Sequence, residues 1–129
     1  MARKASDQPT DVELAILRVL WQRCPATVRQ VHDALAATRD TGYSTTLKMM
    51  QVMFEKGLLH RDESQRPQLY TPAESEEKTQ TDMVRDLMRK VFGGSARKLV
   101  MRAVESESVS AEELAEIRKL IKKLEGDKQ

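Results

Sequence analysis

The residues best suited to binding chemistry lie in one short stretch, residues 42–57. Placed on a helix, one face carries hydroxyl, amine and methyl-bearing side chains, namely Ser44, Thr45, Lys48, Met49 and Val52. The opposite face is apolar and comprises Tyr43, Leu47, Met50, Met53 and Phe54. Tyr43, at the N-terminal end of this stretch, is also counted among the candidate DNA contacts. No carboxylate that would repel phosphate occurs between Thr41 and Phe54. Because these polar and methyl groups suit base edges, the first face predicts entry into a DNA major groove.

The ends of this helix follow from its flanking residues. Ser44 is a suitable N-cap, and Gly57 suits the left-handed position after the last turn. We therefore predict a helix over residues 45–56. The same pattern also fits an ordinary amphipathic core helix, and this segment alone does not separate the two interpretations.

Two further helices are predicted before this stretch. Thr10 and Glu13 have the spacing of a capping box, and the apolar periodicity after them indicates a helix over residues 11–22. A break at residues 24–26 precedes Thr27, where a shorter helix begins. On the polar face of this second helix, Arg29 and Gln30 either contact a phosphate backbone or are simply solvated.

A β-hairpin is predicted directly after Gly57. Two short runs, residues 58–63 and 68–72, flank a polar turn that contains Pro67. Three helices followed by a hairpin are typical of a winged helix-turn-helix. In that fold Arg61 and Arg66 would contact phosphates beside the groove, although the neighbouring carboxylates of residues 62 and 63 could pair with them instead.

The rest of the chain is predicted to form three helices. Their apolar stripes contain one aromatic residue, Phe92, and bury little surface within one chain. A two-fold dimer would cover them, so we assign the dimer contacts to Met83, Leu87, Val91, Leu99, Val100, Leu114, Ile117, Ile121 and Leu124. The alternative is that these helices pack on the winged helix of their own chain. The predicted domains are residues 9–72 for DNA binding and residues 73–126 for dimerisation.

Composition and isolated reactive residues argue against other classes of function. The net charge of +2 indicates nucleic acid only weakly. His32 and Cys24 have no spaced partners that would make a metal or nucleophile site, so we predict no enzyme activity, no metal and no cofactor. No apolar run is long enough to cross a bilayer, which predicts a cytoplasmic protein without membrane insertion.

Segments spread along nearly the whole chain resemble one family of bacterial regulators. They are residues 9–17, 43–46, 55–58, 70–72, 92–95 and 110–114. Together they are similar to the penicillinase repressor family, which includes the BlaI, MecI and CopY regulators. The resemblance implies a mainly α winged helix-turn-helix with a small β-hairpin and a C-terminal helical dimerisation region. It also implies repression at a dyad operator of double-stranded DNA.

The resemblance further implies how repression ends. In the family a membrane metallopeptidase sensor cleaves an Asn-Phe bond in the dimerisation region. The best matching positions here are Arg102 and Ala103, so this chain departs from that specificity. The cysteine cluster of the copper-sensing branch is also missing from the C-terminal sequence.

Two functional hypotheses follow from the sequence. The first is a homodimeric repressor that is released when its dimerisation region is disrupted or cleaved. The second is a winged helix that binds a protein instead of DNA, through an apolar patch of Met49, Val52 and Met53.

Overall fold

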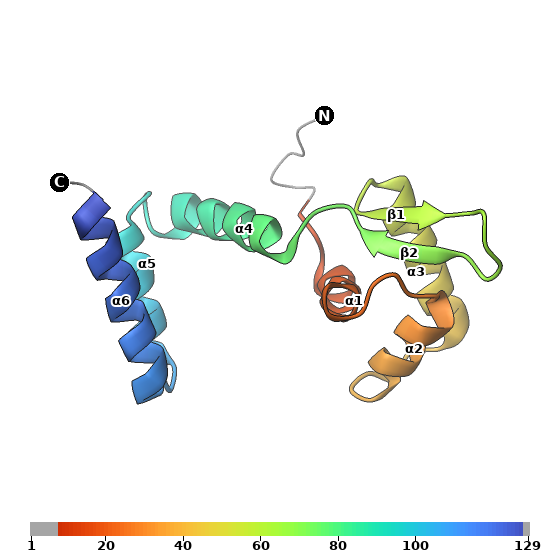
Figure 1. Cartoon of the computed structure of the whole chain (residues 1–129), viewed down its shortest axis with the longest axis horizontal. Helices are drawn as coiled ribbons and strands as arrows, with labels where there is room; N and C mark the ends of the chain where they lie inside the picture. Colours follow the sequence, from red (N-terminus) through yellow and green to blue (C-terminus); the bar gives the residue numbers. More distant parts are fainter. Residues whose placement is uncertain (1–7, 128–129) are drawn as a thin grey trace. The chain divides into compact units, whose positions relative to one another are not determined.

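The computed structural model describes residues 8–127, which form six helices and one hairpin (Figure 1). In chain order the elements are α1 (Asp11–Gln22), α2 (Val28–Ala36), α3 (Tyr43–Glu55), β1 (Leu59–Asp62), β2 (Leu69–Pro72), α4 (Glu76–Val91), α5 (Ala96–Ser106) and α6 (Ala111–Asp127). This order confirms the predicted fold class. The described chain divides into two compact units, residues 8–84 and 85–127. None of the helices described is long and apolar enough to cross a membrane.

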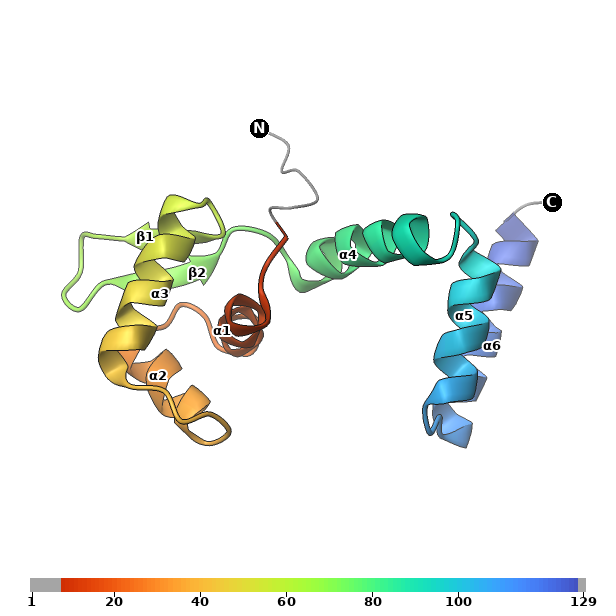
Figure 2. The same cartoon turned by 180° about the vertical axis from the view of Figure 1, so that it is seen from behind.

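The first unit has a single apolar core between α1, α2, α3 and the hairpin (Figure 2). Its buried residues come from every one of these elements and include Ile16, Leu20, Val31, Leu35, Met50, Met53, Leu59 and Tyr70. The indole nitrogen of Trp21 donates to the carbonyl oxygen of Glu74 over 3.1 Å, which attaches the segment after β2 to α1. Of the predicted inner face of α3, Met50 and Met53 are buried, and Leu47 and Phe54 pack against the core.

The sheet contains a pairing that the sequence did not indicate. β1 and β2 are antiparallel, with Leu59 opposite Pro72 and Arg61 opposite Tyr70. In addition, Ala26 pairs with Tyr70 through two backbone hydrogen bonds of 3.1 and 2.8 Å. The turn between α1 and α2 is thereby joined to the hairpin. A single paired residue produces no alternating pattern, so sequence periodicity could not reveal it.

Helix ends follow the predicted chemistry except at α3. Thr10 caps α1 and forms the predicted capping box, and Gly57 has the left-handed φ of +85° after α3. Ser44, however, is not the N-cap, because α3 begins at Tyr43 and Gly42 is the cap. The carbonyl oxygen of Gly42 already accepts from the backbone N–H of Thr46 over 3.1 Å. The Thr46 hydroxyl also points to this carbonyl, which favours the earlier start.

The second unit is built from thin helices with little burial. Ser95 caps α5 and Ser110 caps α6, each accepting a backbone N–H three residues on. Gly93 and Gly94, both with positive φ, separate α4 from α5. α5 and α6 run antiparallel to each other (Figures 1 and 2). None of the residues described for these two helices is fully buried, as the thin apolar stripes predicted.

A buried carboxylate connects the start of α1 to the end of α3. Glu13 accepts from the backbone N–H of Thr10 at 2.9 Å and from Lys56 Nζ at 2.8 Å. Burial alone would raise the pKa of Glu13, but the hydrogen bonds from Lys56 and Thr10 outweigh it and lower the pKa below its ordinary value. The ionised form is thus stabilised by folding.

Glu13→Gln should destabilise the protein by about 1–2 kcal/mol at neutral pH, because the amide keeps the cap but loses the charged partner of Lys56. Since the folded-state pKa of Glu13 is depressed, this stabilisation is complete above the unfolded-state pKa of about 4.3 and disappears as the pH falls through the folded value. Urea unfolding from about pH 7 down to pH 3 measures the difference. Glu55→Gln, at an exposed carboxylate of α3, is the control. A deficit that does not shrink with acid would contradict the ionic explanation.

Candidate nucleic-acid interface

The outward face of α3 matches the predicted polar stripe in most positions. Ser44, Thr45 and Lys48 are exposed, and Val52 is half-buried at the edge of the same face. Gln51 is exposed as well and extends the face by another turn, although we did not include it among the predicted contacts. The sequence did contain a signal for Gln51, because residues three apart lie on the same face of a helix and Gln51 follows Lys48 by three. The exposed groups are therefore two hydroxyls, an amine and an amide.

Two methionines of α3, Met49 and Met53, are less exposed than the predicted DNA contact of Met49 and the predicted protein-binding patch of Met49, Val52 and Met53 require. Met49 is half-buried and packs against the core, so it is only marginally available to a base edge. Met53 is completely buried. The reason is the width of the inner face, because α3 packs against α1, α2 and β1 together and buries more than one stripe.

At the N-terminal end of α3, Tyr43 supports an arginine of α2. The guanidinium carbon of Arg29 lies 4.2 Å from the centroid of the Tyr43 ring, a cation–π geometry. His32 meets the same ring edge-on at 5.8 Å, and its Nδ1 lies 3.5 Å from the Thr46 hydroxyl. Tyr43, which was predicted on the inward face and also as a DNA contact, is 37% exposed because it lies at the rim between α2 and α3. This arrangement holds Arg29 beside the first turn of α3.

Gln30 has a structural task that the sequence analysis did not foresee. Its Oε1 accepts from the backbone N–H of Thr27 at 2.9 Å, while the Thr27 hydroxyl accepts from the Gln30 backbone at 3.1 Å. The two residues thus form the capping box of α2. A contact from Gln30 to DNA is limited to its amide nitrogen, because the oxygen is used within the helix.

The two hairpin arginines differ in their surroundings. Arg66 is exposed in the turn, where its Nη1 donates to the carbonyl oxygen of Glu63 at 3.2 Å. Arg61 is mostly covered, with only 18% of its side chain exposed. It pairs with Glu63, as the sequence allowed. Asp62 instead accepts from the backbone and hydroxyl of Ser64, and these hydrogen bonds lower the pKa of Asp62.

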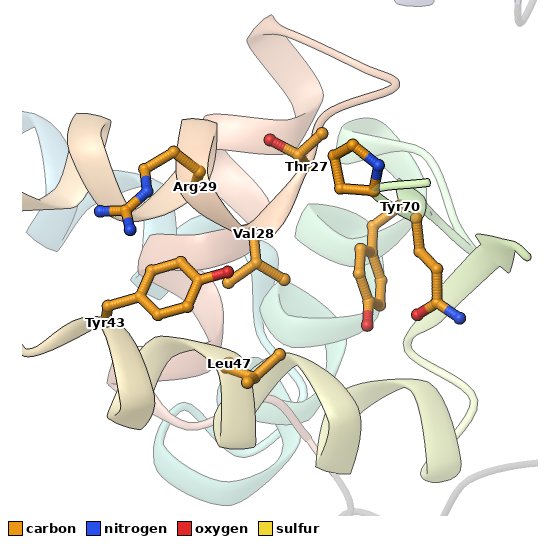
Figure 3. A pocket seen from close by; sticks show the side chains of 8 residues that line it. Thr27, Val28, Arg29, Tyr43, Leu47 and Tyr70 are labelled. Atoms are coloured by element: carbon orange, nitrogen blue, oxygen red, sulfur yellow. The ribbon is translucent and has the colours of Figure 1, made fainter. Parts of the chain in front are cut away.

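The elements that carry the predicted contacts border one cavity of about 150 Å³. Figure 3 shows Arg29 and Tyr43 on one side of it and Tyr70 on the other, with Val28 and Leu47 between them. Pro67 and Gln68 complete the wall from the hairpin turn. The N-terminus of α2, the first turns of α3 and the hairpin therefore lie next to each other, as a winged helix requires for contact with one stretch of duplex.

Comparison with known proteins decides the family. The sequence model of the family described as "Penicillinase repressor" matches residues 9–123. The chain belongs to the penicillinase repressor family. The family consists of transcriptional repressors and not of enzymes. This confirms the resemblance to the family and the prediction of no enzyme activity. Among the described residues no group of side chains could hold a metal ion, and Cys24 is a free, exposed thiol.

Individual relatives agree with the family assignment. The chain is 32% identical over 117 residues to the transcriptional regulator BlaI of Mycobacterium tuberculosis, covering 89% of this chain and 83% of that protein. It is 23% identical over 118 residues to the penicillinase repressor of Bacillus licheniformis, covering 92% of each. Identity to the methicillin resistance regulatory protein MecI of Staphylococcus aureus (strain N315) is 20% over 114 residues, covering 88% of this chain and 93% of that protein.

In this family member we expect Lys48 and Arg66 to contribute differently to binding. Lys48→Ala should weaken specific binding by about 1–3 kcal/mol and relax preference at one position of each half-site, because Lys48 projects from the centre of the exposed face of α3. Arg66→Ala should weaken binding to all duplexes alike and reduce the salt slope by about one. Titrations of specific and random duplexes at several salt concentrations measure both effects. Equal losses on both duplexes for Lys48→Ala would assign it to the backbone.

Proposed function

We propose that this protein is a homodimeric repressor that binds a two-fold symmetric operator with α3 in the major groove. The observation that carries the proposal is the exposed face of α3, which presents Ser44, Thr45 and Lys48 without a carboxylate before Glu55. Arg29 and Arg66 lie on the elements that flank this face and would contact the phosphate backbone. The hydroxyls, the amine and the Val52 methyls would contact base edges.

The second unit supports dimerisation through its uncovered apolar side chains. Leu87, Val91, Val100, Ile121 and Leu124 are all at least 44% exposed, and they belong to the set assigned to the dimer. The remaining members of that set are half-buried, namely Leu99, Leu114 and Ile117 in the second unit and Met83 at the end of the first. A two-fold partner would cover the exposed members with an identical set, which is the simplest way to remove this much apolar surface from water.

We propose that the operator is released by cleavage or disruption of this second unit. Arg102 and Ala103, the positions that match the family's cleavage site, lie within α5 and are exposed. A peptidase needs an extended substrate, so cleavage there would require local unfolding of a helix that has no fully buried residue. We propose a cytoplasmic repressor and, as its partner, a membrane metallopeptidase sensor whose specificity differs from Asn-Phe.

The alternative, a winged helix that binds a protein, is less well supported. Its apolar patch required Met49, Val52 and Met53, but Met53 is buried and Met49 packs against the core. Val52 is what remains of that patch at the edge of a polar face. Binding of the purified chain to random duplex at low salt separates the two functions, because a DNA-binding protein retains non-specific affinity there.

Ile121→Asp should convert the dimer to monomers and abolish operator binding at concentrations that saturate with wild type. The carboxylate would be buried in the apolar interface, whereas in the isolated chain the site is exposed, so the monomer should remain folded. Sedimentation and circular dichroism measure the two properties. The control is Ala115→Asp, an equal charge change at an exposed position of α6 outside the predicted interface. A persistent Ile121→Asp dimer would place the interface elsewhere.

A chain that ends at Arg102 should be largely monomeric and should fail to shift operator DNA when the full chain does. It lacks all of α6 and with it Ile121 and Leu124, yet it retains the complete core of the first unit. Loss of the second half-site contact removes the advantage of intramolecular binding. Mobility shifts and sedimentation of both chains provide the test. Full operator affinity in the shortened chain would show that disruption of the dimer is not the release mechanism.

A further inference from the structure

We propose that Arg61 is a positioning residue that holds the hairpin against the end of α3, rather than a residue that binds the DNA backbone. This inference rests on the proposed function, because the position of the hairpin matters through the duplex that it shares with α3. It also changes the role assigned to Arg61 from the sequence, where it was grouped with Arg66.

The guanidinium of Arg61 is occupied on its face and on its edge. Its carbon lies 3.9 Å from the centroid of the Phe54 ring, which belongs to the last turn of α3. Its Nε donates to Glu63 Oε1 at 3.0 Å, and Nη2 pairs with the same oxygen. A phosphate that used this edge of the guanidinium would have to displace the carboxylate, which repels it. The site is therefore built to hold an arginine in place and not to present one.

Contacts of Arg61 extend across the hairpin to the turn before α2. Its partner in the antiparallel register is Tyr70, which is buried in the core. Hydrogen bonding with the Tyr70 side chain, and then with Glu63, raises the pKa of Arg61 above its ordinary value. Tyr70 is also the residue that pairs with Ala26. Arg61 thus links β1 to α3, and its register partner Tyr70 links β2 to the segment that leads into α2.

Arg66 and Arg29 in the same unit are more accessible to a phosphate than Arg61 is. Both are exposed. The two hydrogen bonds of Arg66 go to backbone carbonyls of its own turn and use the same nitrogen, Nη1. Arg29 rests on the ring of Tyr43, and its contact involves the guanidinium face. Backbone contacts require a guanidinium edge that can reach outward, which these two residues provide better than Arg61 does.

The geometry has a specific consequence for DNA binding. If α3 is seated in the groove, the angle of the hairpin decides whether Arg66 reaches the backbone beside it. Phe54 and Arg61 fix that angle where β1 meets the last turn of α3. Lysine cannot replace arginine in this role, because an ammonium has no planar face to stack on Phe54 and no fork for Glu63.

The test compares Arg61→Lys, Arg61→Gln, Phe54→Leu and the control Arg66→Gln in the full chain. The probe is the duplex recovered with wild-type protein by selection from random DNA, at a temperature where every variant is folded by circular dichroism. Arg61→Lys and Arg61→Gln should lose affinity alike, by roughly fivefold to thirtyfold, while the salt slope stays that of wild type. Arg66→Gln should lower the slope by about one. In the double variant, Phe54→Leu should add little to the loss of affinity caused by Arg61→Lys, because both substitutions remove the same contact.

The opposite pattern would overturn the proposal. If Arg61→Lys binds like wild type and Arg61→Gln lowers the salt slope by about one, Arg61 is a phosphate contact. Additive losses for Phe54→Leu and Arg61→Lys would exclude the shared contact. A second measurement does not involve DNA: amide hydrogen exchange of β1 and β2 should accelerate in Arg61→Lys and not in Arg66→Gln. If the wild-type protein selects no duplex, the proposed function fails. Unchanged hydrogen exchange of β1 and β2 in Arg61→Lys would separately reject the positioning role of Arg61.

Discussion

Burial of the inner face of α3 is the constraint on which the rest of the first unit depends. Thr46, Met50 and Met53 are at most 1% exposed, so the helix has only one orientation in which these side chains leave water. Both helix ends are then held separately, by Gly42 at the start and by the Glu13 to Lys56 ion pair at the end. A helix that is fixed in rotation and at both ends presents one defined face. Such rigidity is what recognition of base edges requires, because a small rotation would move every contact.

The fold was predictable largely because its elements are local. Capping pairs such as Thr10 with Glu13, the glycine breaks and the helical periodicity are all encoded within a few residues of each other. What the sequence could not provide were contacts between distant segments, such as Ala26 with Tyr70 or Glu13 with Lys56. Periodicity says which face of a helix is apolar, but it contains no information about the partner that covers it.

The same limit explains what the sequence could not show about individual candidate residues. Sequence position put Met49 on the outward face and Tyr43 on the inward face, since a helical wheel divides residues into two halves. In the structure α3 packs against several elements, so its inner face is wider at Met49, while Tyr43 lies at the rim beside α2. Arg61 is a third case. A basic residue in a hairpin suggests a DNA contact, and only the placement of Phe54 and Glu63 shows that the charge is already engaged.

The ion pairs of Lys56 and Arg61 give a reason why a DNA-binding protein of this kind would need two subunits. The net charge of the chain is only +2. Within the first unit Lys56 is paired with Glu13 and Arg61 with Glu63, which leaves fewer cations able to displace counterions from DNA. A single first unit should therefore bind a half-site weakly at physiological salt, and most of the useful affinity must come from coupling two half-sites. In the proposed repressor, weak half-site binding would make the dimer the most effective point of control. Under the proposed function, the ion pairs that hold the first unit together would also make operator release depend on the second unit.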